Sequence, residues 1–348
     1  MVLKHLQRHA RALLGICVGF CCLVSVTPAD TAPYELKFAT LAPAGSTWMN
    51  LLEQWGERVK TASGGRLLIK FYPGGVQGDE PDVIKKIRFD QLQGGAFSGH
   101  GIGMIYSPAR VMELPFLFDN YEETDFVRAQ LMPEFRSGFH EHGYELLGWM
   151  EIGFVHMFSR APIRSFDDMK AQRVWLWQGD PLGQAFFDAS GITPVPLSIV
   201  DVYTSLSTGL IDTVYCTPLA SIALQWFNKV HFVSDAALTN AIGALLVSRR
   251  FFDSLPGDLQ TLLRETGEST GEQLIAATRA DNQASLDELK KQGLEFLPPG
   301  PGMQPADLIT LRDKAAERLM DSDYLPRALV TRTRALLDQY RAAHAAAH

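Results

Sequence analysis

The sequence predicts an α/β fold with two domains, and three observations carry this prediction. Segments with strand periodicity alternate with segments of helical periodicity, and Gly or Pro residues separate them. Such alternation is typical of βαβ units on a parallel sheet. The chain has 348 residues, which is more than a single hydrophobic core usually serves.

Residues 1–29 have the pattern of an export signal. Lys4, Arg8 and Arg11 precede an apolar run from Ala12 to Val26, and small residues follow that run. The run is short for a membrane-spanning helix, so we expect the segment to be removed after export. A retained membrane anchor is the alternative.

Composition excludes several classes of function. The chain has 32 basic and 39 acidic residues, and without the three basic residues of the expected signal the difference, 29 minus 39, is −10. Nucleic-acid binding needs clustered Lys and Arg, so no nucleic-acid partner is expected. Three of the four cysteines lie in the expected signal, which leaves Cys216. We therefore expect no intrachain disulfide, no metal site built on cysteines and no cofactor.

The first domain is predicted element by element. Apolar and polar side chains alternate over 35–41, which predicts a first strand. Ser46 or Thr47 caps the helix that follows, and Gly64 ends it. The same reasoning predicts strands over 67–72, 96–100 and 145–150, and helices over 83–92 and 122–140.

The second domain is built around two further strands. A strand over 173–177 places Arg173, Trp175 and Trp177 on one face, because side chains alternate along a strand. The next strand, over 210–218, ends at a proline, which cannot donate to a ladder.

These strand ends predict a ligand pocket. Ligands of parallel α/β sheets bind beyond the carboxyl ends of the strands, so residues 177–180 and 215–217 are expected to form a pocket wall. A helix over 258–291, with Gly267 and Gly271 as expected bends, is long enough to pack on both domains and to limit their motion.

Several motifs occur in an order that resembles one protein family. They are Phe38 to Pro43, Tyr72 to Glu80, Leu114 to Phe118, Gly148 to Phe154, Ser165 to Lys170, Val202 to Leu206 and Gly209 to Asp212. In these motifs the chain is similar to the solute-binding proteins of TRAP transporters. The resemblance covers nearly the whole mature chain. It implies a periplasmic, non-enzymatic protein with two α/β lobes around a central cleft, which closes on a small molecule.

The resemblance also implies boundaries and partners. We expect lobe I over 34–152 and 243–282, lobe II over 153–242 and 283–330, and a C-terminal helix and tail over 331–348. The partners would be the TRAP membrane permease subunits. Some members of the family work with a helical-repeat protein, which is a further candidate partner.

The chain differs from the family at positions that usually bind the ligand. Trp175 stands where carboxylate-binding members usually have an arginine, Val155 replaces a second arginine, and Thr217 replaces an asparagine. A guanidinium binds a carboxylate in a bidentate way, and an unpaired carboxylate in a closed cleft costs several kcal/mol. We therefore expect a hydrophobic ligand, or one that is not a simple carboxylate.

Two other ligand classes stay open. Arg173 shares a face with the tryptophans and is a candidate to bind a carboxylate from a shifted position, although a surface ion pair is its alternative. A cation could also lie over the faces of Trp175 and Trp177, whose alternative is ordinary core packing. The complete set of residues expected to contact the ligand is Trp48, Phe97, Ser98, His100, Phe116, Val155, Arg173, Trp175, Trp177, Gln178, Ile199, Tyr215, Cys216 and Thr217.

Catalytic motifs are not found at their usual spacing. Ser98 lacks the flanking glycines of a nucleophile elbow, and the glycines from residue 99 onward lack the spacing of a dinucleotide loop. His140 and His142 are two residues apart, on different sides of a helix, so they do not form a zincin site. A cleft hydrolase or isomerase would need a histidine within reach of Ser98 or Cys216. That enzyme, and a sensor on the same scaffold, are the rival hypotheses.

Overall fold

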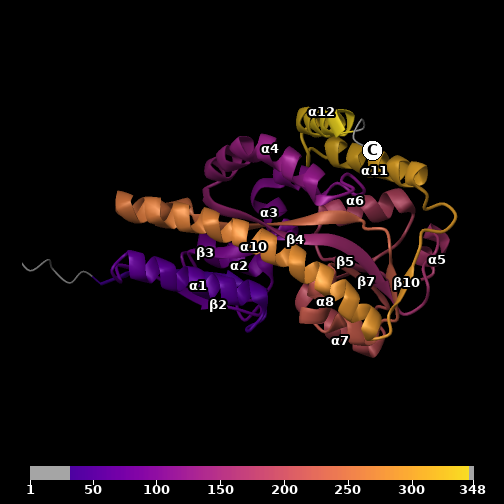
Figure 1. The fold of residues 1–348 in the computed structure, drawn as a ribbon, viewed down its shortest axis with the longest axis horizontal. Coiled ribbons are helices and arrows are strands. Elements are labelled where there is room, and N and C mark those ends of the chain that lie inside the picture. Colours follow the sequence, from indigo (N-terminus) through magenta and orange to yellow (C-terminus); the bar gives the residue numbers. More distant parts are fainter. Residues whose placement is uncertain (1–31, 345–348) are drawn as a thin grey trace, which may run out of the picture. The chain divides into compact units, whose positions relative to one another are not determined.

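The structure is a computed structural model that describes residues 32–344. The expected signal at 1–29 lies outside the described residues. The α/β prediction is confirmed: strands form a mixed central sheet, and helices pack on it (Figure 1). The strand order is β10-β8-β4-β9-β3-β1-β2, and β7 pairs with β4.

The first half of the sheet follows the predicted βαβ pattern. Strand β1 (Tyr34–Thr40) pairs in parallel with β2 (Leu67–Tyr72) and with β3 (Gly94–Ser98). Helix α1 (Thr47–Ala62) connects β1 to β2, and α2 (Glu80–Arg88) connects β2 to β3. The Ser46 and Asp79 side chains cap the two helices by accepting backbone N–H bonds.

Strand β4 is much longer than the predicted segment over 145–150. It runs from Tyr144 to Ser159 and pairs antiparallel first with β9 (Thr239–Ser248), then with β7 (Thr213–Cys216) and β8 (Phe232–Ser234). Gly153, at φ 107°, lies where the register with β9 shifts. Such an irregularity lets a strand bend and continue, so β4 joins the two halves of the sheet.

Two further predictions of strand ends were wrong. The strand predicted over 96–100 ends at Ser98, and His100 belongs to α3 (Gly99–Tyr106), because the Ser98 hydroxyl accepts the His100 N–H and starts the helix. The strand predicted over 173–177 is only β5 (Trp175–Trp177), which pairs in parallel with β6 (Val195–Leu197) in a separate two-stranded sheet.

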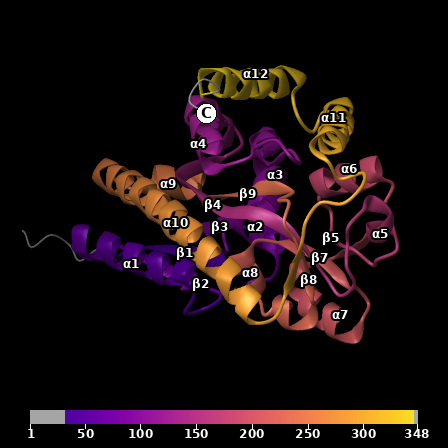
Figure 2. The ribbon, with the colours of Figure 1, turned by 45° about the vertical axis from the view of Figure 1, so that its right-hand side comes forward.

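The longest helix, α10 (Gly257–Lys291), crosses the sheet along β4. It also contacts α1 and α8 (Pro218–Ala223), as the orange helix in Figures 1 and 2 shows. Gly267 and Gly271 were expected to bend this helix. Instead, a Cβ on either residue would overlap with the backbone or Cβ of Leu147 to Trp149, so these glycines allow close packing on β4.

The last two helices pack on different parts of the molecule. Helix α11 (Pro305–Asp321) contacts α6 (Pro181–Ser190), and α12 (Arg327–His344) contacts α4 (Tyr121–Glu141). The remaining elements are η1 (Ser107–Glu113), α5 (Phe166–Lys170), η2 (Ile199–Asp201), α7 (Val202–Thr208), η3 (Trp226–Lys229), α9 (Arg249–Ser254) and β10 (Glu295–Leu297).

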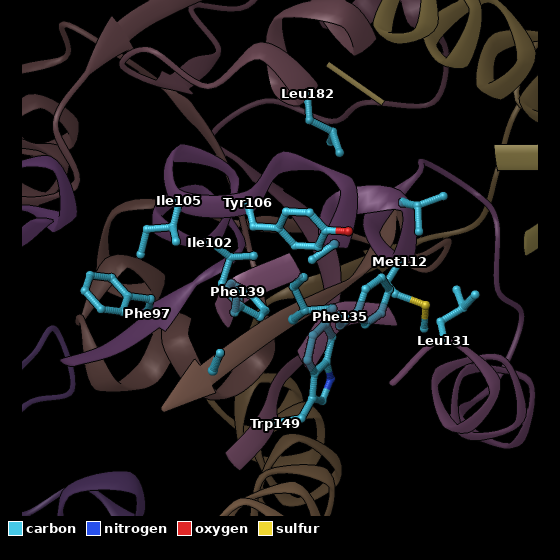
Figure 3. Packing of buried hydrophobic residues seen from close by; sticks show 14 of the residues in the cluster. Phe97, Ile102, Ile105, Tyr106, Met112, Leu131, Phe135, Phe139, Trp149 and Leu182 are labelled. Atoms are coloured by element: carbon cyan, nitrogen blue, oxygen red, sulfur yellow. The ribbon is translucent and has the colours of Figure 1, made fainter. Parts of the chain in front are cut away.

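The largest core cluster contains aromatic side chains of α3 and α4 together with side chains of the sheet (Figure 3). The Phe135 ring of α4 stacks on Trp149 of β4 with centroids 5.3 Å apart, and Tyr106 of α3 meets Phe139 edge to face. This packing anchors α3, which carries His100. Within residues 32–344, the helices are too short or too polar for one of them to cross a membrane.

Candidate functional site

A cavity of about 430 Å³ lies between the two halves of the sheet. Strand β3 and helix α3 bound it on one side, and β5 and β7 bound it on the other. Eleven of the residues predicted from the sequence line it: Trp48, Phe97, Ser98, His100, Val155, Trp175, Trp177, Ile199, Tyr215, Cys216 and Thr217.

Aromatic side chains form one wall of the cavity. Trp175 stacks on Tyr215 with ring centroids 4.9 Å apart, and Trp226 of η3 meets Trp175 edge to face at 5.4 Å. The Trp175 indole N–H donates to the backbone oxygen of Leu197 at 3.0 Å. The polar end of this indole is therefore satisfied within the protein, and its apolar part faces the cavity.

Asp79 links the two sides of the cavity. Its Oδ2 accepts hydrogen bonds from the Trp177 indole at 3.0 Å, from the Ser198 hydroxyl and from the Ile199 N–H at 3.3 Å. Its Oδ1 accepts from the N–H of Glu80 at the start of α2. One carboxylate thus caps a helix on the first side and holds three groups of the second side, so the structure is in a closed conformation.

A buried ion-pair cluster also crosses the cavity, and its residues were not predicted from the sequence. Arg110 of η1 is 4% exposed and pairs with Glu113 on its own element and with Asp180, which caps α6, at 2.8 Å. Tyr324, between α11 and α12, lies 3.4 Å from the same guanidinium. Burial raises the pKa of Glu113, whereas Asp180 keeps a lowered pKa because Arg110 offsets its burial. The guanidinium is therefore neutralised by the protein itself.

Glu80 is a second buried carboxyl group at the cavity, and it too was missed. It accepts hydrogen bonds from the Ser98 N–H and the Gly101 N–H, each at 2.6 Å, and from the Ser98 hydroxyl at 2.9 Å. Burial outweighs these bonds and raises the pKa of Glu80 to about 8. Glu80 is therefore protonated at neutral pH and adds no negative charge to the cavity.

His100 has a different environment from the other polar groups. It is 4% exposed, and neither ring nitrogen has a hydrogen-bond partner among residues 32–344. The imidazole stacks on Trp177 with centroids 4.9 Å apart and planes 26° apart. Burial lowers the pKa of His100, which favours the neutral imidazole.

Three predicted residues lie outside the cavity lining. The Arg173 side chain is 57% exposed and pairs with Asp212 at 2.9 Å, which is the surface ion pair named as its alternative. Gln178 is exposed, and its N–H donates to the Leu197 oxygen. The ring of Phe116 packs against Phe186 in a core cluster, while its neighbour Pro115 reaches the cavity.

Within the described residues, no histidine makes a hydrogen bond to Ser98 or to Cys216. The Ser98 hydroxyl donates to Glu80, and His100 makes no hydrogen bond to Ser98. Burial raises the pKa of the Cys216 thiol, which is opposite to what a nucleophilic thiolate needs. Across residues 32–344, no three His, Cys, Asp or Glu side chains are grouped as metal ligands.

The sequence signals for the missed residues are weak. Arg110 and Glu113 stand three apart in an otherwise apolar stretch, and Asp180 precedes a proline at a helix start. Each pattern is typical of helix ends and surface pairs as well. Trp226, Phe186 and Phe187 complete the aromatic lining but lie in segments with no motif.

Comparison with known proteins gives the family. Residues 38–306 match the family described as bacterial extracellular solute-binding protein, family 7. The chain is 20% identical to the 2,3-diketo-L-gulonate-binding periplasmic protein YiaO of Escherichia coli, over 79% of this chain and 84% of that protein. It is 23% identical to the C4-dicarboxylate-binding periplasmic protein DctP of Rhodobacter capsulatus, over 81% of this chain and 86% of that protein.

Solved structures share the fold. A TRAP periplasmic solute-binding protein of Roseobacter denitrificans with bound β-D-glucuronate superposes with a TM-score of 0.80, at 19% identity, and covers 86% of this chain and 99% of its own. One of Ralstonia eutropha with bound (S)-2-acetolactate gives 0.79 at 21% identity, with 88% and 99% covered. Because the family match covers most of the chain, the protein belongs to the family of TRAP-type periplasmic solute-binding proteins, which bind solutes for transporters and are not enzymes.

Proposed function

We propose that this protein binds a neutral, predominantly apolar solute in the cavity and delivers it to the membrane subunits of a TRAP transporter. The observation that carries the proposal is the pairing of Arg110. This residue is the one Lys or Arg side chain among the described cavity-lining residues, and two carboxylates of the protein already occupy it.

A carboxylate ligand has no free cationic partner among the described cavity-lining residues. Two of the solved relatives hold glucuronate or acetolactate, each with a carboxylate group. In this chain Trp175 and Val155 line the cavity at the positions expected to hold arginines, and Arg173 points to a surface partner. A carboxylate would have to compete with Asp180 and Glu113 for Arg110, or stay unpaired at a cost of several kcal/mol.

A cationic ligand is also disfavoured. A cation needs a free aromatic face within about 6 Å. Trp175 is 1% exposed and stacks on Tyr215, while His100 covers one face of Trp177. The indoles therefore offer apolar edges and packed faces, which suit a hydrocarbon or ring surface.

The closed structure fits delivery by lobe motion. We propose lobe I as 34–152 with 243–282, and lobe II as 153–242 with 283–330. These boundaries fall inside β4 and β9 and inside α10, so the lobes are joined by continuous elements. A ligand would shift the population toward the closed state by contacting both lobes at once.

Native mass spectrometry of the protein expressed in the periplasm tests this function. We expect an apolar, neutral adduct that is lost after unfolding and refolding. Trp175→Ala should weaken the adduct, whereas Arg173→Ala, outside the cavity, should leave it unchanged. An adduct identified as a carboxylate, lost in Arg173→Ala and kept in Trp175→Ala, would overturn the proposed ligand class.

A further inference from the structure

His100 lies where the two sides of the cavity meet. It belongs to α3 on the first side, whereas Trp177, which stacks on it, belongs to β5 on the second side. Asp79 holds the Trp177 indole in this position. When the sides separate, Trp177 leaves the imidazole and water reaches it.

Closure therefore costs the imidazole its hydrogen bonds to water. Both ring nitrogens lack a partner in the closed structure, and buried polar groups without partners are unfavourable. The cost is far larger for the protonated ring, because a charged group is harder to bury than a neutral one.

The charged surroundings do not remove this cost. Burial lowers the pKa of His100, Asp180 and Asp79 oppose that shift, and Arg110 adds to it. In the described part of the chain, no carboxylate accepts a hydrogen bond from the ring. The titratable and charged groups of the neighbouring elements are Asp79 and Glu80 at α2, Arg110 and Glu113 at η1, Asp180 at α6 and Tyr324 before α12.

We propose that protonation of His100 opens the closed cleft, so that acid pH shifts this protein toward its open, ligand-releasing form. The neutral ring is accepted between the lobes at a small cost, and the protonated ring must return to water. His100 thus makes closure depend on the proton as well as on the ligand.

The direction with pH follows from the two states. In the open form the ring is in water, where the pKa of a histidine side chain is about 6.5. The closed form binds the proton less well, so the closed population falls as pH drops below that value. With one linked proton, the closed-to-open ratio changes by up to about tenfold per pH unit.

Two carboxyl groups of the cleft could also affect how the closed-to-open ratio depends on pH. Asp180 has a lowered pKa that depends on Arg110 across the cleft, so it also favours opening in acid, but only at the lower pH where aspartates titrate. Glu80 has a raised pKa, so any effect of closure on it would favour the closed form in acid, the opposite sign. Its hydrogen-bond partners Ser98 and Gly101 lie on its own side of the cleft and stay with it.

A distance measurement across the cleft tests the proposal without a ligand of known identity. Labels would be placed at Lys85→Cys on α2 and Ser207→Cys on α7, which are both exposed, and Cys216 is buried. The distance between the two spin labels would be measured by pulsed electron paramagnetic resonance between pH 7.5 and 5.0. Two samples would be compared, the protein as isolated from the periplasm and the same protein after refolding. We expect the closed-to-open ratio to fall by up to about tenfold per pH unit below about 6.5.

Substitutions of His100 test whether this residue causes the loss of the closed form in acid, which we call the pH step. His100→Phe keeps a ring against Trp177 without a buried unpaired nitrogen or a titration, so the closed population should rise and lose its pH step. His100→Gln, which is polar but does not titrate, should also lose the step and serves if the Phe variant folds poorly. The matched control is His156→Gln, because His156 is a buried histidine with a lowered pKa in β4, hydrogen-bonded to the Ser234 oxygen and outside the cavity lining.

The outcome of this experiment tests the pH switch independently of the proposed class of ligand. The same closed population at pH 7.5 and 5.0, or a step that persists in His100→Phe, would overturn the proton switch and leave the apolar-ligand proposal unaffected. A step that disappears in His156→Gln as well would show that general acid destabilisation causes it, which also overturns the switch.

Discussion

Trp177 donates its indole N–H to Asp79 across the cavity, and the two residues are 98 positions apart in the chain. Asp79 also caps α2 through its other oxygen. The closed cleft is therefore held by a carboxylate that is fixed in place by a helix start. Trp177 has two roles here, because its ring also covers His100.

Asp79→Asn should open the cleft. The Asn oxygen can still cap α2, but its amide group then faces the Trp177, Ser198 and Ile199 donors. Hydrogen bonds to a charged group contribute about 1.5–3 kcal/mol each, so we expect the closed-to-open ratio to fall at least tenfold. The label distance between α2 and α7 measures it.

Asp82→Asn is the control for this change. Asp82 lies on the same helix and is exposed, and it makes none of these bonds across the cleft. Equal closed populations in the two variants would show that the Asp79 contacts do not hold the cleft.

Gly271→Ala should destabilise the whole protein. Its new Cβ would overlap with the backbone of Trp149, which cannot move aside easily inside a sheet. Overpacking of this kind costs about 1–3 kcal/mol. Chemical denaturation measures the change in the free energy of unfolding.

Gly257→Ala is the matched control in the same helix. Residue 257 is exposed, and a Cβ there meets nothing within 4 Å. Alanine is a better helix former than glycine, and the gain is small at Gly257 because this residue is the first of the helix. We therefore expect this variant to be as stable as the parent or slightly more stable, and a similar loss in both variants would refute the close-packing argument.

Local sequence patterns were enough to predict where helices and strands occur. The bounds of some strands depend on contacts between residues far apart in the chain, which such patterns do not contain. The strand β2 was predicted at its observed bounds because its periodicity and its Gly and Pro neighbours are local signals. The length of β4 could not be read in the same way, because its second half is defined by strands more than 50 residues further along the chain.

The candidate site shows the same division. Trp175 and Trp177 were placed on one face by strand periodicity, and both line the cavity. Strand alternation would put Arg173 on the same face as these tryptophans. The strand begins after Arg173, however, and Asp212 pairs with it at the surface. Arg110 was missed because Asp180, 70 positions away, is what identifies it as a buried cleft residue.

Arg110→Met should cost far more than an ordinary ion pair. It leaves Glu113 and Asp180 buried without their cation. Breaking a buried pair in this way typically costs about 3–5 kcal/mol, and denaturant titration would show the loss. The half-exposed pair of Arg173 gives the comparison, because Arg173→Met should cost less than about 1 kcal/mol.

A double variant tests whether the charges act as one unit. Arg110→Met with Asp180→Asn removes both the cation and one of the stranded carboxylates. We expect its loss of stability to be smaller than the sum of the two single losses. Simple additivity would mean that the cluster is not coupled across the cleft.

Glu80 should make the protein less stable as pH rises. Its pKa is about 8 in the folded protein, against about 4.3 in an unfolded chain. Between these values unfolding releases a proton, so the stability that this group contributes is complete below about pH 4.3 and is lost as pH rises toward 8. The slope can reach about 1.4 kcal/mol per pH unit.

The buried histidines His100 and His156 have lowered pKa values and give a slope of the opposite sign in acid, so the comparison must be between variants. The free energy of unfolding would be measured from pH 5 to pH 9 for the parent, for Glu80→Gln and for Glu57→Gln, which alters an exposed glutamate on α1. The parent and the Glu57 variant should run parallel, and both should lose stability relative to Glu80→Gln as pH rises. A constant difference between the parent and Glu80→Gln over the whole range would mean that Glu80 is already ionised in the folded protein, and that its three hydrogen bonds outweigh its burial.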